Sequence, residues 1–530
     1  MNERLVEDWL TKANERSYQT PFAQALLAEG MQVLRVGHSS HEHGKDIIAI
    51  DKDAKIHAYQ LKDGDFDLKD FEKEFGQITA LVETQIEHPA ISGQPRHQPW
   101  LVISGQVSMP VEDRIRVHNN QWRKRKCTPL KLMTGRQLQA KFANMAADFW
   151  PQMPEDSHRL FNLYLADGKS SLDREAFAKL ISSTTDTEGE IPKAAVVRRL
   201  SAANLFASYA LSPFYKSQNH WELVQGWTMT AAQIAWVADN AKLSPKDWQP
   251  TFRLAVNEAL TSLEALAREA LQPNALGPNG FELDDLTRSR CTICAGSIAV
   301  KILIERRHGK QWDQESLAKE KLEQLFSDGR FYFWGESAVP FWLAAMWALD
   351  QLRPDHFSDR ILFAMLSAIA HQNSKSALPK YPAPYDPADE ALSKAFRRLF
   401  DGEKAMELQA ASSYTLEPLV TIMARRLWRN ALSAIWSEIT KVDLVRLIPD
   451  KPRDLLLWNW GAKRGSNQSR IFPTPQSWGE LLAESRHDED DLLPNVIKED
   501  LDFELIFLLC FPHRLNRAFV KHLENRTRNL

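Results

Sequence analysis

An acid, an amide and an amine lie close together in the amino-terminal part of the sequence, and their spacing could bring them to one site. Ile47–Ile50 is a short β-branched run and Lys55–Leu61 a second apolar one, so the segment predicts two strands joined by a turn. Antiparallel pairing about the centre of that turn sets Asp46 opposite Gln60. Side chains alternate between the faces of a strand, so Lys62 shares the face of Gln60. The three groups together predict a seat for a divalent cation and an attacking water.

The elements that position these groups are predicted from apolar spacing and helix-start signals. Residues 3–14 predict an amphipathic helix, and Thr20-Pro21 predicts the start of a second one, with Thr as N-cap and Pro at the first helical position. Residues 31–36 predict a strand ahead of the pair, and residues 100–104 a later strand. Between them, apolar residues at helical spacing predict a helix over 68–86.

Asp46 and Gln60-Leu61-Lys62, preceded by the helix over 20–30, resemble the PD-(D/E)xK nucleases and, within them, the Mrr-like branch, where Gln often replaces the second acid. The resemblance covers roughly residues 15–145. It implies an α/β restriction-endonuclease-like domain, a mixed sheet flanked by helices. It also implies that Asp46 ligates Mg²⁺, with Mn²⁺ as an alternative, and that Gln60 offers its carbonyl oxygen. Lys62 would then hold or help deprotonate the water.

Further site residues follow from the same resemblance. Many members carry an acid in or near the first helix that completes the metal site; Glu15 is the candidate, against a reading as a solvated surface residue, and Gln24 is a weaker alternative. Glu42 could approach the metal from the loop before Asp46. That loop also holds His41 and His43. Zinc would need a further ligand cluster, so we interpret the loop as a polar cover that touches the phosphate backbone.

A basic run follows a helix predicted over 110–120. Arg123, Lys124, Arg125 and Lys126 lie beside Trp122. More cations extend the run on both sides: Arg114, Arg116, Lys131, Arg136 and Lys141. A cationic run is usually a solvated face, but basic side chains that neutralise phosphates are the main sequence-independent source of DNA affinity. Beside a nuclease-like core, the run predicts a DNA contact.

Length and composition bound the rest of the chain. With 530 residues we expect two to four domains, and 44% apolar with 25% charged residues is typical of a soluble globular protein. A net charge of −3 gives no whole-chain nucleic-acid signature. Four irregularly placed Cys suit a reducing cytoplasm, and the first ten residues do not read as a signal peptide. Residues 338–349 are too short for a membrane span and predict a buried helix.

After residue 150 the pattern becomes helical. We predict a nuclease domain over 1–148, an all-α, solenoid-like regulatory or partner-binding domain over 149–450, and a helical or irregular extension over 451–530. Cys291 and Cys294 form a lone CxxC within this region, which we interpret as buried small residues. The predicted helices cover residues 192–212, 220–242, 249–272, 283–307, 313–327, 338–352, 357–372, 387–401 and 416–441.

These observations favour a metal-dependent DNA endonuclease controlled by its helical region. Mrr-like domains fused to such regions look like bacterial restriction or anti-phage effectors. No helicase or ATPase motif is visible, so a separately encoded ATPase or sensor protein would supply any energy input. Cutting both strands takes two active sites, so we expect a homodimer or a larger homo-oligomer, with no membrane contact. The alternatives are a DNA repair or junction-resolving nuclease and a non-catalytic adaptor that binds DNA or a partner.

Overall fold

The structure is a computed structural model that describes residues 2–36, 45–86, 91, 96–146, 154–185, 191–273, 275, 284–327, 333, 335–353, 357–374, 412–458, 464–487, 489–528 and 530. They form two compact units, Met1–Ala259 and Leu260–Leu530. The domain boundaries near residues 148 and 450 remain a prediction. The helices that follow residue 148 up to Ala259 belong to the same compact unit as the amino-terminal sheet.

A mixed sheet forms the centre of the first unit. Its strands lie in sequence order, with β1–β2 and β2–β3 antiparallel and β3–β4 and β4–β5 parallel. Helices make both parallel crossovers, as parallel pairing requires. The strands in the described residues are β1 (Gln32–Val36), β2 (Ile47–Ile50), β3 (Ile56–Lys62), β4 (His97–Ile103) and β5 (Lys131–Met133).

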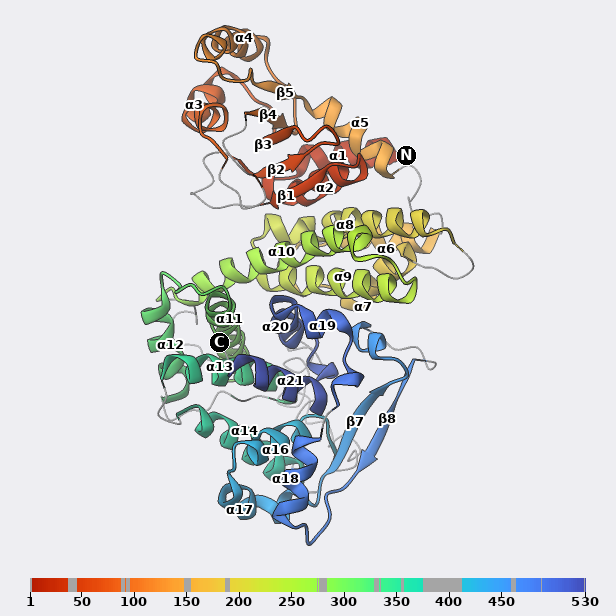
Figure 1. The fold of residues 1–530 in the computed structure, drawn as a ribbon, viewed down its shortest axis with the longest axis vertical. Helices are drawn as coiled ribbons and strands as arrows, with labels where there is room; N and C mark the ends of the chain where they lie inside the picture. The colour runs from red at the N-terminus through yellow and green to blue at the C-terminus, as the bar shows by residue number, and fades with distance from the viewer. Residues whose placement is uncertain are drawn as a thin grey trace. The chain divides into compact units, whose positions relative to one another are not determined.

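Helices cover both faces of this sheet (Figure 1). Helices α3 and α4 lie on one face, called the α3 face below, and α1, α2 and α5 lie on the other. The described residues of the unit contain five further helices, and the last of them, α10, runs across its boundary. The helices are α1 (Asn2–Lys12), α2 (Glu15–Ala28), α3 (Leu68–Glu83), α4 (Met109–Lys124), α5 (Gly135–Ala146), α6 (Pro154–Tyr164), α7 (Arg174–Thr184), α8 (Lys193–Lys216), α9 (His220–Asn240) and α10 (Pro245–Ala270).

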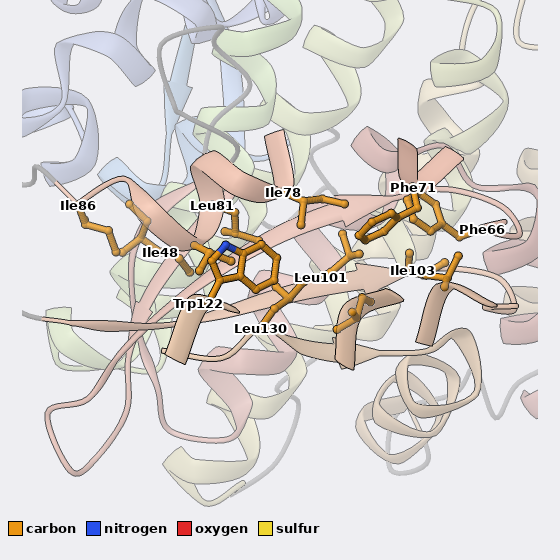
Figure 2. Packing of buried hydrophobic residues seen from close by; sticks show 14 of the residues in the cluster. Ile48, Phe66, Phe71, Ile78, Leu81, Ile86, Leu101, Ile103, Trp122 and Leu130 are labelled. Atoms are coloured by element: carbon orange, nitrogen blue, oxygen red, sulfur yellow. The ribbon is translucent and has the colours of Figure 1, made fainter. Parts of the chain in front are cut away.

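The core under the α3 face is apolar and closed. Figure 2 shows side chains of the sheet and of the two helices pointing toward one another, among them Ile48, Phe71, Leu81, Leu101 and Trp122. All of these are buried. Burying large apolar and aromatic side chains is the main favourable contribution to folding, so this core fixes α3 and α4 on the sheet.

The start of α2 differs from the prediction. The helix begins at Glu15, where the Asn14 side chain caps it by accepting from the Ser17 N–H at 2.9 Å, and Pro21 lies inside the helix. Thr20 is therefore not the N-cap. Asn is as good a cap as Thr, and residues Ser17 to Leu26 gain burial by continuing the helix through Pro21. This earlier start puts Glu15 in the first turn of α2.

The carboxyl end of β3 is held by a tight approach of two turns. A Cβ on Gly105 would lie 2.4 Å from the carbonyl oxygen of Gly64, so only glycine fits there. Asp65 accepts from the Gln106 N–H at 2.7 Å across the same approach. After this turn α3 begins at a capping box formed by Asp67 and Asp70.

The second unit is largely helical, as predicted, and α11 to α14 start and end close to the expected residues. α13 is buried from Val339 to Leu349, which confirms the buried helix. No helix in the described part of the chain is both long and apolar enough to cross a bilayer. The α-helices are α11 (Asp284–Arg307), α12 (Glu315–Ser327), α13 (Val339–Leu352), α14 (Phe357–Ser374), α16 (Leu416–Arg425), α17 (Arg429–Ile439), α18 (Trp478–Arg486), α19 (Asn495–Glu499), α20 (Leu501–Cys510) and α21 (Arg517–Thr527). Short 3₁₀ helices are η2 (Glu336–Ala338), η3 (Pro452–Leu456), η4 (Asp490–Leu492) and η5 (Pro512–Arg514).

Two features of the second unit correct the prediction. The helix expected over 416–441 is two helices, because the chain turns at Leu427, whose φ is +63°. The region is also not all-α. Its described residues contain a sheet in the order β6 (Ser412–Ser413), β7 (Asp443–Pro449) and β8 (Gly465–Arg470), parallel and then antiparallel. The helix expected over 387–401 lies outside the described residues.

Candidate functional site

The β2–β3 hairpin has the register that the sequence predicts. Ile47 pairs with Tyr59, so Asp46 lies beside Gln60 where the strands begin to separate. The Asp46 carboxylate is tied to β3, because its Oδ2 accepts from the Leu61 N–H at 2.6 Å. Alternation along β3 places the Gln60 side chain on the α3 face with Ala58, whereas the Asp46 carboxylate lies against the backbone of β3 at Leu61.

The Gln60 side chain is buried under α3, with 1% of its surface exposed. Its Nε2 donates to Oε1 of Gln77 on α3 at 2.7 Å. Its own Oε1 has no hydrogen-bond partner among the described residues. Buried polar atoms are nearly always hydrogen-bonded, so this carbonyl oxygen is an acceptor that the described residues leave unsatisfied.

Lys62 lies between two carboxylates. Its Nζ is 3.2 Å from Oε1 of Glu15 on α2 and 3.1 Å from Oε2 of Glu74 on α3. Burial acts to lower the pKa of Lys62, but the charges and hydrogen bonds of the two carboxylates outweigh it, and the net pKa is raised. Lys62 is therefore an ammonium at neutral pH. Burial raises the pKa of Glu15, and the charge of Lys62 opposes this only in part.

Helix α2 holds the backbone of the same strands. The buried Tyr18 hydroxyl donates to the Lys62 carbonyl oxygen at 2.9 Å, and Gln19 Nε2 donates to the Asp46 carbonyl oxygen at 3.0 Å. Gln24 lies farther along the helix and bonds to Ser201 on α8 at 2.8 Å. The first turns of α2 thus contact the candidate site, whereas Gln24 contacts the neighbouring helices.

Lys45, next to Asp46, is a buried lysine whose Nζ donates to the Ala80 carbonyl oxygen at 3.2 Å near the end of α3. Burial lowers its pKa to about 8. A carbonyl at a helix C-terminus favours a cation but does not fully replace water around it. Burial therefore makes the charged form of Lys45 costly in the folded protein.

The side chains present fit a weakly held magnesium ion. Mg²⁺ is commonly bound by one or two carboxylates, with water and substrate phosphate completing its shell. Asp46 supplies a carboxylate, and the Oε1 of the neighbouring Gln60 supplies a neutral oxygen donor. Across the described ranges, no three or more His, Cys, Asp or Glu side chains form a metal-holding group. Asp46 and Gln60 are thus the two ligands that the described part of the hairpin offers to such an ion.

The basic run lies at the far end of α3 and α4 from Lys62. Arg123 and Lys124 are exposed in the last turn of α4, and Arg125 and Lys126 are exposed just after it. The neighbouring Trp122 is not available for stacking on a base, because it is buried in the core and its Nε1 donates to Glu83 at 3.1 Å.

Some cations of the basic run and its extension along α4 are paired with acids, which reduces the net positive charge of this surface. Arg125 pairs with Glu83 at 2.8 Å, and Arg116 pairs with Asp113 at 2.8 Å. At about 1.5 Å per residue, Glu74, which contacts Lys62, and Glu83, which contacts Arg125, lie about 13 Å apart along α3.

Three of the predicted residues fall outside the described part of the chain: Glu42, His41 and His43. Their contributions stay predictions. The structure in turn adds residues that the sequence analysis did not assign to the site, Glu74 and Gln77 of α3 together with Tyr18 and Gln19 of α2. Glu74 and Gln77 are three positions apart and so share a helix face, which is the signal that the sequence does contain.

Comparisons with known proteins do not add to this picture: no family model matches the chain, and no match is found among curated proteins or among solved structures. The candidate site therefore rests on the geometry of the chain itself.

Proposed function

We propose that the amino-terminal sheet and its helices form a magnesium-dependent endodeoxyribonuclease of the PD-(D/E)xK type, Mrr-like in using Gln60 in place of an acid. The observation that carries the proposal is the hairpin register, which sets Asp46 beside Gln60 and so two residues from Lys62 on β3. The unsatisfied Gln60 carbonyl oxygen supports it, because a hard cation prefers such a ligand.

Hydrolysis of an anionic phosphodiester needs charge neutralisation and an activated water. A bound Mg²⁺ would supply both, by lowering the pKa of a bound water and by neutralising charge on the phosphate. In this proposal Asp46 and Gln60 hold the ion. Lys62, whose pKa is raised by its two carboxylate neighbours, would orient the attacking water and stabilise the negative charge that develops on the phosphate. Glu15 and Glu74 fix the ammonium in place.

In this proposal the helical remainder controls cleavage. The biological role would be that of a cytoplasmic bacterial restriction or anti-phage effector. The protein would act on DNA as a homodimer or larger assembly, with a separate ATPase or sensor supplying any energy input. Within the first unit, the helices after residue 148 already bond to α2, which contacts the site. Cleavage of plasmid, branched and modified DNA compared side by side would separate this role from DNA repair or junction resolution.

The test is cleavage of supercoiled plasmid in Mg²⁺ or Mn²⁺ by the wild type, Asp46→Ala and Lys62→Ala. Each substitution should reduce nicking by about 100-fold or more, since each removes a group that acts on developing charge. Lys69→Ala is the matched control, because Lys69 is an exposed lysine in the first turn of α3. Folding by circular dichroism and DNA binding by gel shift should stay intact in all three variants. A wild type that binds DNA but never cuts it, with an Asp46→Ala, Lys62→Ala double variant that behaves identically, would support an adaptor instead.

A further inference from the structure

The orientation of the Gln60 amide is determined by a chain of contacts that begins at Lys62. The oxygen and the nitrogen of a side-chain amide have nearly the same shape, so their hydrogen-bond partners decide which way round the amide lies. Lys62 Nζ lies 3.4 Å from Oε1 of Gln77. An ammonium only donates hydrogen bonds, so the Gln77 side chain must point its oxygen, and not its NH₂ group, toward Lys62.

That oxygen in turn decides the orientation of Gln60. Gln77 Oε1 is 2.7 Å from the Gln60 amide, and an acceptor at this distance requires the NH₂ group of Gln60 to face it. The Gln60 carbonyl oxygen is therefore directed away from Gln77. It is this oxygen that is buried without a hydrogen-bond partner in the described residues. With the amide turned round, two oxygens would face each other and the NH₂ group would take the place of the ligand oxygen.

We propose that Gln77 is a positioning residue, which holds the Gln60 carbonyl oxygen toward the divalent cation of the proposed nuclease site. The inference rests on the proposed function and names a residue of α3 that the site needs but that does not touch the ion. The chain of contacts begins with two carboxylates, Glu15 and Glu74, which hold the Lys62 ammonium. This ammonium in turn orients Gln77.

Gln77 makes no comparable contribution to packing. It is exposed on α3, next to Gly76, while the core side of that helix consists of Phe71, Ile78, Leu81 and Val82. A change at Gln77 therefore acts on the orientation of Gln60 without opening the core. Partners that orient a metal ligand in this way typically alter metal affinity by about 10–100-fold when they are removed.

The experiment compares the full-length wild type with Gln77→Met, Gln77→Glu and Glu72→Met. Mn²⁺ binding without DNA is measured by the EPR signal of the free ion, and plasmid nicking is measured against Mg²⁺ concentration. Methionine removes the acceptor, so Gln77→Met should weaken Mn²⁺ binding by about 10-fold and shift the Mg²⁺ dependence of nicking equally. Glutamate keeps an acceptor oxygen and should bind Mn²⁺ at least as tightly as the wild type. Glu72→Met changes an exposed side chain of the same helix, 65% accessible, and should change neither readout.

The outcomes separate the inference from the function on which it rests. If the wild type binds Mn²⁺ and nicks DNA, but Gln77→Met does both equally well, the positioning role is wrong and the nuclease stands. If Gln77→Met and a folded Gln77→Glu lose Mn²⁺ affinity alike, the acceptor oxygen is not what matters, and the inference is again overturned. A wild type that neither binds Mn²⁺ nor cuts DNA removes both proposals.

Discussion

A buried hydrogen-bond chain connects α2 to the helices that follow the sheet, and Thr20→Val is the smallest change that breaks it. Thr20 Oγ1 donates to Oε1 of Glu258 on α10 at 2.8 Å. The other carboxyl oxygen accepts from the Tyr215 hydroxyl of α8 at 2.6 Å, and Trp227 Nε1 donates to that hydroxyl at 2.7 Å. All four side chains are buried. Valine has nearly the shape of threonine, so the substitution removes the hydroxyl and leaves Glu258 Oε1 without this donor.

The expected cost follows from which partner is left behind. A hydrogen bond contributes about 0.5–1.5 kcal/mol to stability, or about 1.5–3 kcal/mol when one partner is a charged group. The cost of leaving a buried carboxyl oxygen without its donor lies in the second range. We take about 2 kcal/mol. Because about 1.4 kcal/mol is a factor of ten, α2 should open about 30-fold more often.

Hydrogen exchange of the α2 amides, read on peptides that span Glu15–Ala28, measures this opening directly. Local exchange is preferable to a global free energy, since a chain with two compact units need not unfold in one step. Thr230→Val is the matched control: Thr230 is buried in α9, and its hydroxyl donates at 2.9 Å only to the Gly226 carbonyl oxygen of its own helix. It should change α2 exchange by less than about 3-fold, because it orphans no carboxyl oxygen. Equal effects of the two substitutions on α2 would refute the reasoning.

Two further predictions concern buried titratable groups. Lys45→Met should raise the melting temperature at pH 7 and lose most of this advantage by pH 10. Burial lowers the Lys45 pKa from 10.5 to about 8, so between these values the unfolded wild-type chain binds a proton that the folded chain does not. The stability of the wild type therefore rises with pH across that window and approaches that of the variant. The gain at pH 7 is at most about 3 kcal/mol, and a Lys45→Met protein that is less stable at pH 7 would contradict this account. A thiol reagent should label Cys127 in the native protein and reach Cys291, Cys294 and Cys510 only after unfolding, since these three are buried and burial raises the Cys294 pKa to about 11. Rapid native labelling of Cys291 and Cys294 would reopen a metal or redox role for the CxxC.

The hairpin could be predicted from sequence because its signals are local. The β-branched run, the turn and the period of two fix both the register and the face, and these are enough to place Asp46 and Gln60 side by side. The start of α2 could not be fixed in this way. Asn14 and Thr20 are both good N-caps, and the choice between them depends on how much of the helix the rest of the fold buries.

The second unit shows the same limit. Its long helices carry long apolar stretches without Gly-rich or Pro-rich breaks, whereas β8 reads Gly-Ser-Asn-Gln-Ser-Arg and is mostly exposed. A strand without apolar alternation gives no period-two signal, so it is recognised only through its pairing with β7. Trp122 is a comparable case: its place beside four cations suggests a binding surface, but the extra turn of α4 directs it into the core.

The α3 contribution to the site could not be read from sequence for a related reason. Glu74 and Gln77 share one face of a helix, but nothing local says that this face meets Lys62 and Gln60. That contact exists because the crossover returns α3 over the strands it connects. The consequence is that the site is assembled from β3 with one helix on each side: Glu15 of α2 and Glu74 of α3 hold the same ammonium. Helix α2 is also bonded to α8 and α10, so a shift of those helices would move Glu15 and with it Lys62. Because Lys62 contacts Gln77, the shift would also change the orientation of the Gln60 amide. Control of cleavage by the helical region would then need no contact between those helices and DNA.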